Sequence, residues 1–151
     1  MGATTTLLQD LGAFVLAGAN GPGHLKEIAE TIRAGRKYRW VGIYKIMRKE
    51  LVIAAGTGPH PPAYPRFPIT QGLCGAAAES RTTLVVPDVH KDSRYLPTFG
   101  STQSEIVVPI ITERGRVAGV VAVESDKLDA FDEEDRDFLE RAASLIARSL
   151  A

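Results

Sequence analysis

Cysteine is almost absent from this chain, because Cys74 is the only one among 151 residues. An intramolecular disulfide is therefore excluded, and with it the disulfide-stapled architecture of small secreted domains. A redox cycle in which a second thiol of the same chain resolves an oxidised first thiol is excluded as well. The sequence also lacks any apolar run near the roughly 20 residues that a membrane-spanning helix needs. We therefore expect a cytoplasmic protein without a membrane partner.

An excess of charge of either sign is absent too. The chain carries 18 basic and 18 acidic side chains, so its formal net charge is zero. Nucleic acids and anionic membranes recruit proteins largely through clustered positive charge, which argues against both as partners. The three histidines have no spacing typical of metal ligands, so we expect no metal and no other cofactor. A small molecule is the partner that we expect.

Internal repeats are also missing, and the chain length suits one domain over residues 1–151. Residues 1–35 and 132–150 show helical periodicity, whereas residues 38–125 show the patterns of strands and loops. This order predicts an α+β fold. The apolar stripes of the terminal helices either cover one face of the sheet or also join two copies of the chain into a homodimer, and the sequence leaves both possibilities open.

Residues 40–47 (WVGIYKIM) give the strongest strand prediction. Side chains alternate between the faces of a strand, so Trp40, Gly42 and Tyr44 share one face. A glycine inside a strand often marks the close approach of a ligand or another backbone. A gap between two aromatic walls suits a small, flat or sulfur-containing ligand. The alternative is that another part of the protein fills this gap.

Two segments, one on each side of residue 70, contain further candidates for a binding site. Residues 57–68 contain five prolines, which exclude a central strand and are typical of a long binding loop or lid. Residues 72–78 (GLCGAAA) predict a helix of small residues with Cys74 near its N-terminus, where the helix dipole favours a thiolate. The alternative is that Cys74 is an ordinary buried side chain.

Residues 105–111 and 116–125 predict an antiparallel hairpin with its turn at residues 112–115. Glu105 begins the first strand, and Glu124 lies near the end of the second. This placement brings the two carboxylates to neighbouring strand ends, where they can hold an amine together. The alternative is a pair of solvated strand ends.

Five motifs in this order resemble the free methionine-(R)-sulfoxide reductases of the GAF domain superfamily. The motifs are residues 39–44 (RWVGIY), 72–75 (GLCG), 86–89 (VPDV), 104–109 (SEIVVP) and 131–135 (FDEED). The resemblance implies a central antiparallel sheet of about six strands. It also implies N- and C-terminal helices on one face of the sheet and a loop-capped ligand pocket on the other.

The same resemblance implies roles for single residues. Trp40 and Tyr44 correspond to walls of the pocket, and Glu105 corresponds to a contact with the amino group or the sulfoxide of the substrate. The Asp-x-Asp motif of the family falls on Ala122 and Glu124, so one carboxylate is missing and the other is longer. The charge complement for a free amino acid is therefore weakened.

The chain departs further from the family at the cysteines. Members carry one cysteine ten residues before Cys74 and a catalytic one seven residues before Glu105, and this chain has Tyr64 and Thr98 there. A threonine hydroxyl is far less acidic than a thiol and cannot accept the sulfoxide oxygen. The resemblance thus supports the pocket more strongly than the reaction.

We therefore favour a noncatalytic small-molecule-binding or sensory GAF module, derived from a reductase-like ancestor and without a catalytic residue. Its pocket is expected between the strand of Trp40 and Tyr44 and the loops around Tyr64 and Thr98. One alternative is a divergent free methionine-(R)-sulfoxide reductase in which Cys74 attacks the sulfoxide and an external thiol resolves the product. Another alternative is a structural dimerisation domain whose pocket is filled.

Overall fold

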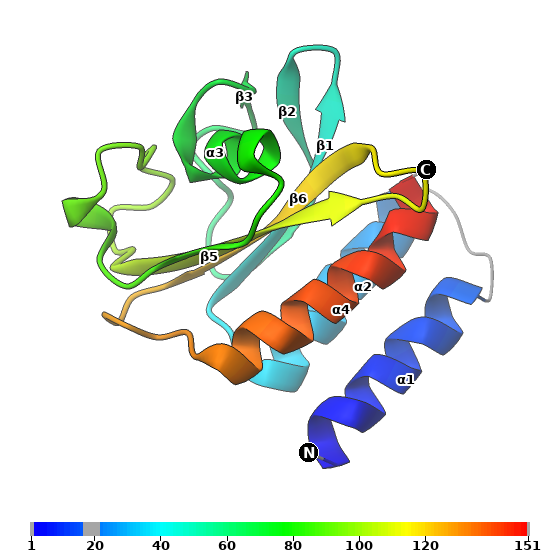
Figure 1. The fold of residues 1–151 in the computed structure, drawn as a ribbon. Helices are drawn as coiled ribbons and strands as arrows, with labels where there is room; N and C mark the ends of the chain where they lie inside the picture. The colour runs from blue at the N-terminus through cyan, green and yellow to red at the C-terminus, as the bar shows by residue number, and fades with distance from the viewer. Residues whose placement is uncertain (1, 17–21, 151) are drawn as a thin grey trace.

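The computed structural model describes residues 2–16 and 22–150, which form a single sheet with helices on both sides (Figure 1). The elements follow one another as α1 (Gly2–Leu16), α2 (Pro22–Arg36), β1 (Trp40–Met47), β2 (Glu50–Thr57), β3 (Arg66–Pro68), α3 (Gly72–Ser80), β4 (Leu84–Val86), the short 3₁₀ helix η1 (Val89–Lys91), β5 (Ser104–Ile111), β6 (Val117–Ser125) and α4 (Glu133–Leu150). None of the described helices combines the length and the apolarity needed to cross a bilayer.

The six strands of the sheet have the order β3-β2-β1-β6-β5-β4, and every neighbouring pair is antiparallel. Strands β1, β6 and β5 are central and largely buried on both faces, which explains their nearly continuous apolar sequences. The proline-rich segment contributes only β3 at one edge, where a missing backbone N–H costs least. The predicted α+β fold with a six-stranded antiparallel sheet is confirmed.

Helices α2 and α4 pack on one face of the sheet and build the larger core. Their fully buried side chains include Ile28 and Ile32 from α2 and Phe138 and Leu139 from α4. Helix α1 lies on the same side but mainly contacts α4 and α2, so it forms an outer layer (Figure 1). The reason is that α2 and α4 already occupy the sheet face.

The opposite face carries α3 and the loops between β4 and β5. A second core of buried residues fills this side and includes Trp40, Tyr44, Phe67 and Leu73. Residues 92–103 cover it as an irregular loop whose Tyr95, Leu96 and Phe99 pack inward. The face away from the terminal helices is therefore the place where loops and strands enclose small cavities.

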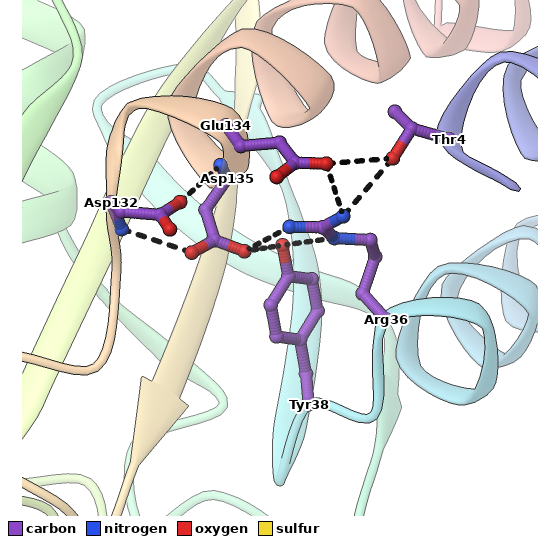
Figure 2. A network of polar contacts seen from close by, with 6 residues as sticks. All are labelled: Thr4, Arg36, Tyr38, Asp132, Glu134 and Asp135. Atoms are coloured by element: carbon purple, nitrogen blue, oxygen red, sulfur yellow. Dashed lines mark hydrogen bonds and ion pairs between the residues drawn. The ribbon is translucent and has the colours of Figure 1, made fainter. Parts of the chain in front are cut away.

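A polar network ties the helical layers together at the start of α4 (Figure 2). Asp132 caps the helix by accepting a hydrogen bond from the Asp135 backbone N–H at 3.0 Å, and the Asp135 side chain accepts one from the Asp132 backbone N–H at 2.9 Å. The other Asp135 oxygen accepts from Arg36 Nη2 at 2.8 Å and from the Tyr38 hydroxyl at 2.7 Å. Arg36 Nη1 also donates to the Thr4 hydroxyl at 3.0 Å, which connects α1 to the network. Asp132 is therefore the N-cap of α4.

Replacing Arg36 with methionine should lower the free energy of unfolding by about 2 kcal/mol near neutral pH, because Asp135 would lose a charged partner in a largely buried place. Burial alone raises the pKa of Asp135, but hydrogen bonds from Arg36, the Asp132 backbone and Tyr38 outweigh it and lower that pKa. The stabilisation is thus present above the pKa of an unfolded aspartate and is lost as the pH falls through the lower folded value. Urea unfolding of the wild-type protein and of Arg36→Met at neutral and at acidic pH measures the difference in the free energy of unfolding. The exposed pair of Arg141 and Asp137 supplies the control, since Arg141→Met should change stability by less than about 0.5 kcal/mol.

Candidate functional site

Two small cavities meet at Glu124 on the face covered by α3 and the 92–103 loop. The inner cavity is lined by Tyr44, Phe67, Gly72, Leu73, Cys74, Leu96, Thr98, Glu105, Ala122 and Glu124. The outer cavity is lined by Arg39, Trp40, Pro59, His60, Phe99, Ser101, Thr102 and Glu124. Each has a volume of about 10 Å³, which is close to the space that one water molecule needs.

Glu105 and Glu124 form the polar centre of this site. They lie directly opposite each other in the register of β5 and β6, and they are only 4% and 2% exposed. Glu124 Oε1 accepts a hydrogen bond from the Thr102 hydroxyl at 2.8 Å, whereas the Glu105 carboxylate has no hydrogen-bond or ion-pair partner among the described residues. The close placement of the two carboxylates agrees with the prediction, and the alternative of two solvated strand ends is wrong.

Burial changes the ionisation of both carboxyl groups. It raises the pKa of Glu124 to about 7, although the hydroxyls of Thr102 and Thr98 act in the opposite direction. Burial and then the charge of Glu124 hold the pKa of Glu105 well above its ordinary value. Two ionised carboxylates at these positions would repel each other without water to screen them, so the pair favours states with at least one proton.

Cys74 lies in the first turn of α3, as predicted, but its environment does not favour a thiolate. The side chain is 7% exposed, and burial raises the pKa of the thiol well above its ordinary value. Glu105 and then Glu124 raise it further, because a thiolate would be a third negative charge in one cavity. The expectation that the helix dipole lowers this pKa is therefore wrong, since desolvation and two acidic neighbours outweigh it.

The N-terminus of α3 adds hydrogen-bond donors to the same cavity. Gly72, Leu73 and Cys74 line the inner cavity, and the N–H groups of a first helical turn have no intrahelical acceptor. Gln71 at the N-cap makes no side-chain hydrogen bond to them. The inner cavity thus contains two kinds of binding group close together. The backbone N–H donors suit a negatively charged group, and the carboxylates suit a positively charged one.

Trp40 and Tyr44 do not enclose the open gap that the sequence predicts between them. Trp40 and Tyr44 are both buried, with ring centroids 6.4 Å apart. A Cβ added at Gly42 would overlap the Trp40 ring, so this ring lies over the glycine and fills the expected gap itself. Phe99 packs edge-on against Trp40, with the two ring centroids 5.1 Å apart, and lines the outer cavity. The glycine is needed because of a neighbouring side chain rather than a ligand.

The structure brings together most of the candidate residues but not all of them. Thr98 and Ala122 line the inner cavity with Tyr44, Cys74 and the two glutamates. Tyr64 is 43% exposed and is not among the residues that line either cavity, because its proline-rich loop contributes Pro59 and His60 instead.

The sequence analysis missed Thr102, Leu96 and Phe99. These residues belong to a segment with no strand or helix period, although two apolar residues within a polar loop were an available signal. Their role depends on how this loop folds over the sheet, which periodicity does not report.

Comparison with known proteins agrees with this geometry. A family model of the GAF domain matches residues 24–150. GAF domain-containing protein A of Dictyostelium discoideum is 33% identical over 141 residues, which cover 93% of this chain and 87% of that protein. The free methionine-R-sulfoxide reductase of Saccharomyces cerevisiae is 43% identical over 79 residues, which cover 52% of this chain and 44% of the reductase.

A solved structure extends the likeness to three dimensions. The free methionine-R-sulfoxide reductase of Neisseria meningitidis, in complex with its substrate, superposes with a TM-score of 0.88 at 29% identity. The superposition covers 97% of this chain and 87% of that one. By sequence and by fold, the chain belongs to the GAF domain family and is related to the free methionine-R-sulfoxide reductases.

Proposed function

We propose that this chain is a noncatalytic GAF module that binds a small molecule with an ammonium group in the cavity beneath residues 92–103. The carrying observation is the buried carboxylate of Glu105, which has no partner among the described residues. Burying an acidic group without a partner costs free energy, and a purely structural core has no need of it. A bound cation would supply the missing partner.

The chemistry of the inner cavity favours an ammonium group over a metal ion. Its lining holds two carboxylates and no lysine, arginine or histidine. Within residues 2–16 and 22–150, no three His, Cys, Asp or Glu side chains are grouped to hold a metal. A Ca²⁺ ion takes six to eight oxygen ligands, which this pair does not supply. An amine needs only two or three acceptors.

The donors of α3 narrow the ligand class to small zwitterions. The α3 N-terminus suits a carboxylate, and Phe67, Leu73 and Leu96 offer an apolar surface for a side chain. A free amino acid has all three parts. Because relatives are named free methionine-R-sulfoxide reductases, free methionine and its sulfoxide are the first compounds to test.

The thiol chemistry argues against turnover. Cys74 is the only cysteine, and its raised pKa keeps the thiol protonated at neutral pH. Thr98 stands where the related enzymes carry their catalytic cysteine, and a hydroxyl cannot enter the sulfenic acid cycle. The module would therefore hold its ligand without changing it.

Binding requires the 92–103 loop to move. A cavity of about 10 Å³ is far smaller than the roughly 300 Å³ or more of a typical ligand pocket. Displacing Leu96 and Phe99 would join the inner and outer cavities, and a moved loop is a signal that a partner can detect. The same small volume favours the alternative of a homodimerising scaffold, joined through its terminal helices, whose pocket stays filled.

Isothermal titration calorimetry with L-methionine and L-methionine-(R)-sulfoxide tests the proposal. We expect saturable binding that Glu105→Gln weakens by at least about 30-fold, since truncating one member of a buried charge pair costs 2 kcal/mol or more. Glu113→Gln, in the exposed turn between β5 and β6, is the matched control.

An assay with dithiothreitol or thioredoxin as reductant separates the remaining alternatives. We expect no turnover of the sulfoxide. Turnover that disappears in Cys74→Ser would establish a reductase. The absence of both binding and turnover would contradict the proposed function and leave the scaffold as the remaining alternative.

A further inference from the structure

We infer that the Glu105–Glu124 pair holds one proton in the empty pocket and releases it to water when an ammonium group binds between the two carboxylates. The first half concerns the protein alone, and the second half rests on the proposed function. Together they make ligand affinity depend on pH through a built-in acid pair.

The geometry of the hairpin places the pair. Glu105 and Glu124 are direct partners in the β5–β6 register, and directly opposite residues have Cβ atoms about 4.5–5.5 Å apart on one face of the sheet. Both side chains are almost completely buried. Water therefore cannot screen their mutual repulsion, and one shared proton removes it.

The inner cavity offers no positive charge to replace this proton. From α3 and β1, the Cys74 thiol and the Tyr44 hydroxyl face the pair, and burial raises the pKa of both, so they stay neutral. From the covering loop come three hydroxyl groups, those of Tyr95, Thr98 and Thr102. No charged group of α3, β1 or the loop thus compensates the two carboxylates.

Charged groups also line two other spaces that include Glu124, but the arginines among them pair with other acidic side chains. Arg39 and His60 line the outer cavity, and a cleft of about 510 Å³ on that side is lined by Arg33, Arg36, Lys37, Arg39, Asp126, Lys127 and Asp135 together with Glu124. The three arginines pair with Glu30, Asp135 and Asp126. None of the cationic groups forms an ion pair with Glu105 or Glu124 among the described residues.

Thr102 makes the pair unequal. Its hydroxyl donates to Glu124 at 2.8 Å, and a donated hydrogen bond favours the ionised form of the acceptor. Glu105 has no such donor among the described residues, and burial and the charge of Glu124 hold its pKa well above its ordinary value. The shared proton therefore resides mainly on Glu105, while Glu124 keeps the charge and the two titrate as a unit.

Binding of an ammonium group makes the doubly ionised state of the pair the favourable one. The O–H bond of Glu105 breaks, its proton goes to water, and N–H groups of the ligand donate to both carboxylates. The pair then carries two negative charges against one positive charge of the ligand. Because protons compete with the ligand, affinity should rise about tenfold for each unit by which the pH increases above about 7, where Glu124 is ionised and Glu105 still holds its proton.

The first test needs no ligand. Infrared difference spectra of the ligand-free protein at about pH 8, above the pKa of about 7 of Glu124 and well above the ordinary pKa of glutamate, should contain the carbonyl band of a protonated carboxyl group. We expect Glu105→Gln to remove the band and Glu113→Gln to retain it. Absence of the band in the wild-type protein overturns the proton-sharing inference.

The second test measures the proton directly during binding. Titration with L-methionine at about pH 8, in two buffers of different ionisation enthalpy, should give about one proton released per ligand, because Glu124 is then already ionised and the amino group of the free amino acid is still largely protonated. Thr102→Val should raise the pH at which proton release falls to one per ligand, since Glu124 loses its donor and its pKa rises. Binding without proton release contradicts the inference and leaves the proposed function intact. A protonated carboxyl group without any binding contradicts the proposed function instead.

Discussion

Replacing Glu124 with glutamine should stabilise the fold at about pH 8, raising the free energy of unfolding by about 3 kcal/mol. Burial raises the pKa of this group from its ordinary value of 4.5 to about 7 in the folded protein. The wild-type protein is therefore not penalised below pH 4.5 and loses stability as the pH rises through about 7. Glutamine keeps the shape and the acceptor for Thr102 but never ionises, so the penalty disappears.

Urea unfolding at about pH 5 and pH 8 measures this effect. We expect the gap between Glu124→Gln and the wild-type protein to widen toward pH 8, with Glu105→Gln changing stability in the same direction. Glu113→Gln lies in an exposed turn and should follow the wild-type protein at both pH values. A variant that is equally destabilised at both pH values would show that the carboxylate is compensated in the fold.

Replacing Gly75 with alanine should lower the free energy of unfolding by about 3 kcal/mol. An added Cβ would overlap the carbonyl oxygen of Ile69, which is backbone and cannot rotate away. The Ile69 segment is itself held, because its N–H donates to the Lys49 carbonyl at 2.9 Å. Helix α3 would have to move away from this segment, which would also disturb the end of the helix that lines the inner cavity.

Calorimetric melting curves test this prediction. A loss of 3 kcal/mol in a domain of this size corresponds to a fall of about 10 °C in Tm. Gly100→Ala in the covering loop is the control, because a Cβ there meets no atom within 4 Å and should leave Tm unchanged or slightly raised. Equal melting temperatures for the two variants would mean that α3 is not held against residue 69.

The parts of the site that sequence analysis located are those set by local rules. Strand periodicity and a short turn determine the register of a hairpin, so the sequence alone predicts that Glu105 and Glu124 are neighbours. The start of α4, predicted at residue 132, follows in the same way from helical periodicity, and Asp132 caps it. Each of these inferences uses residues that are close in sequence or joined by one turn.

The parts of the site that sequence analysis missed depend on contacts between segments far apart in the chain. The spacing of Trp40 and Gly42 indicated a gap, but the rotamer of the Trp40 ring closes it. Tyr64 was assigned to the pocket by position, yet the path of its loop leaves it exposed. Phe99 and Thr102 entered the site only because the 92–103 loop folds back over the sheet.

By itself, the sequence determined the terminal helices, the strand of residues 40–47, the central hairpin with its two acidic residues and the single thiol, because composition and periodicity are properties of the chain. Only the tertiary structure decided that Cys74 is a protonated thiol and that Glu105 and Glu124 share one buried environment. A pKa depends on the water that is excluded and on the charges that come near, and both are set by contacts between distant segments.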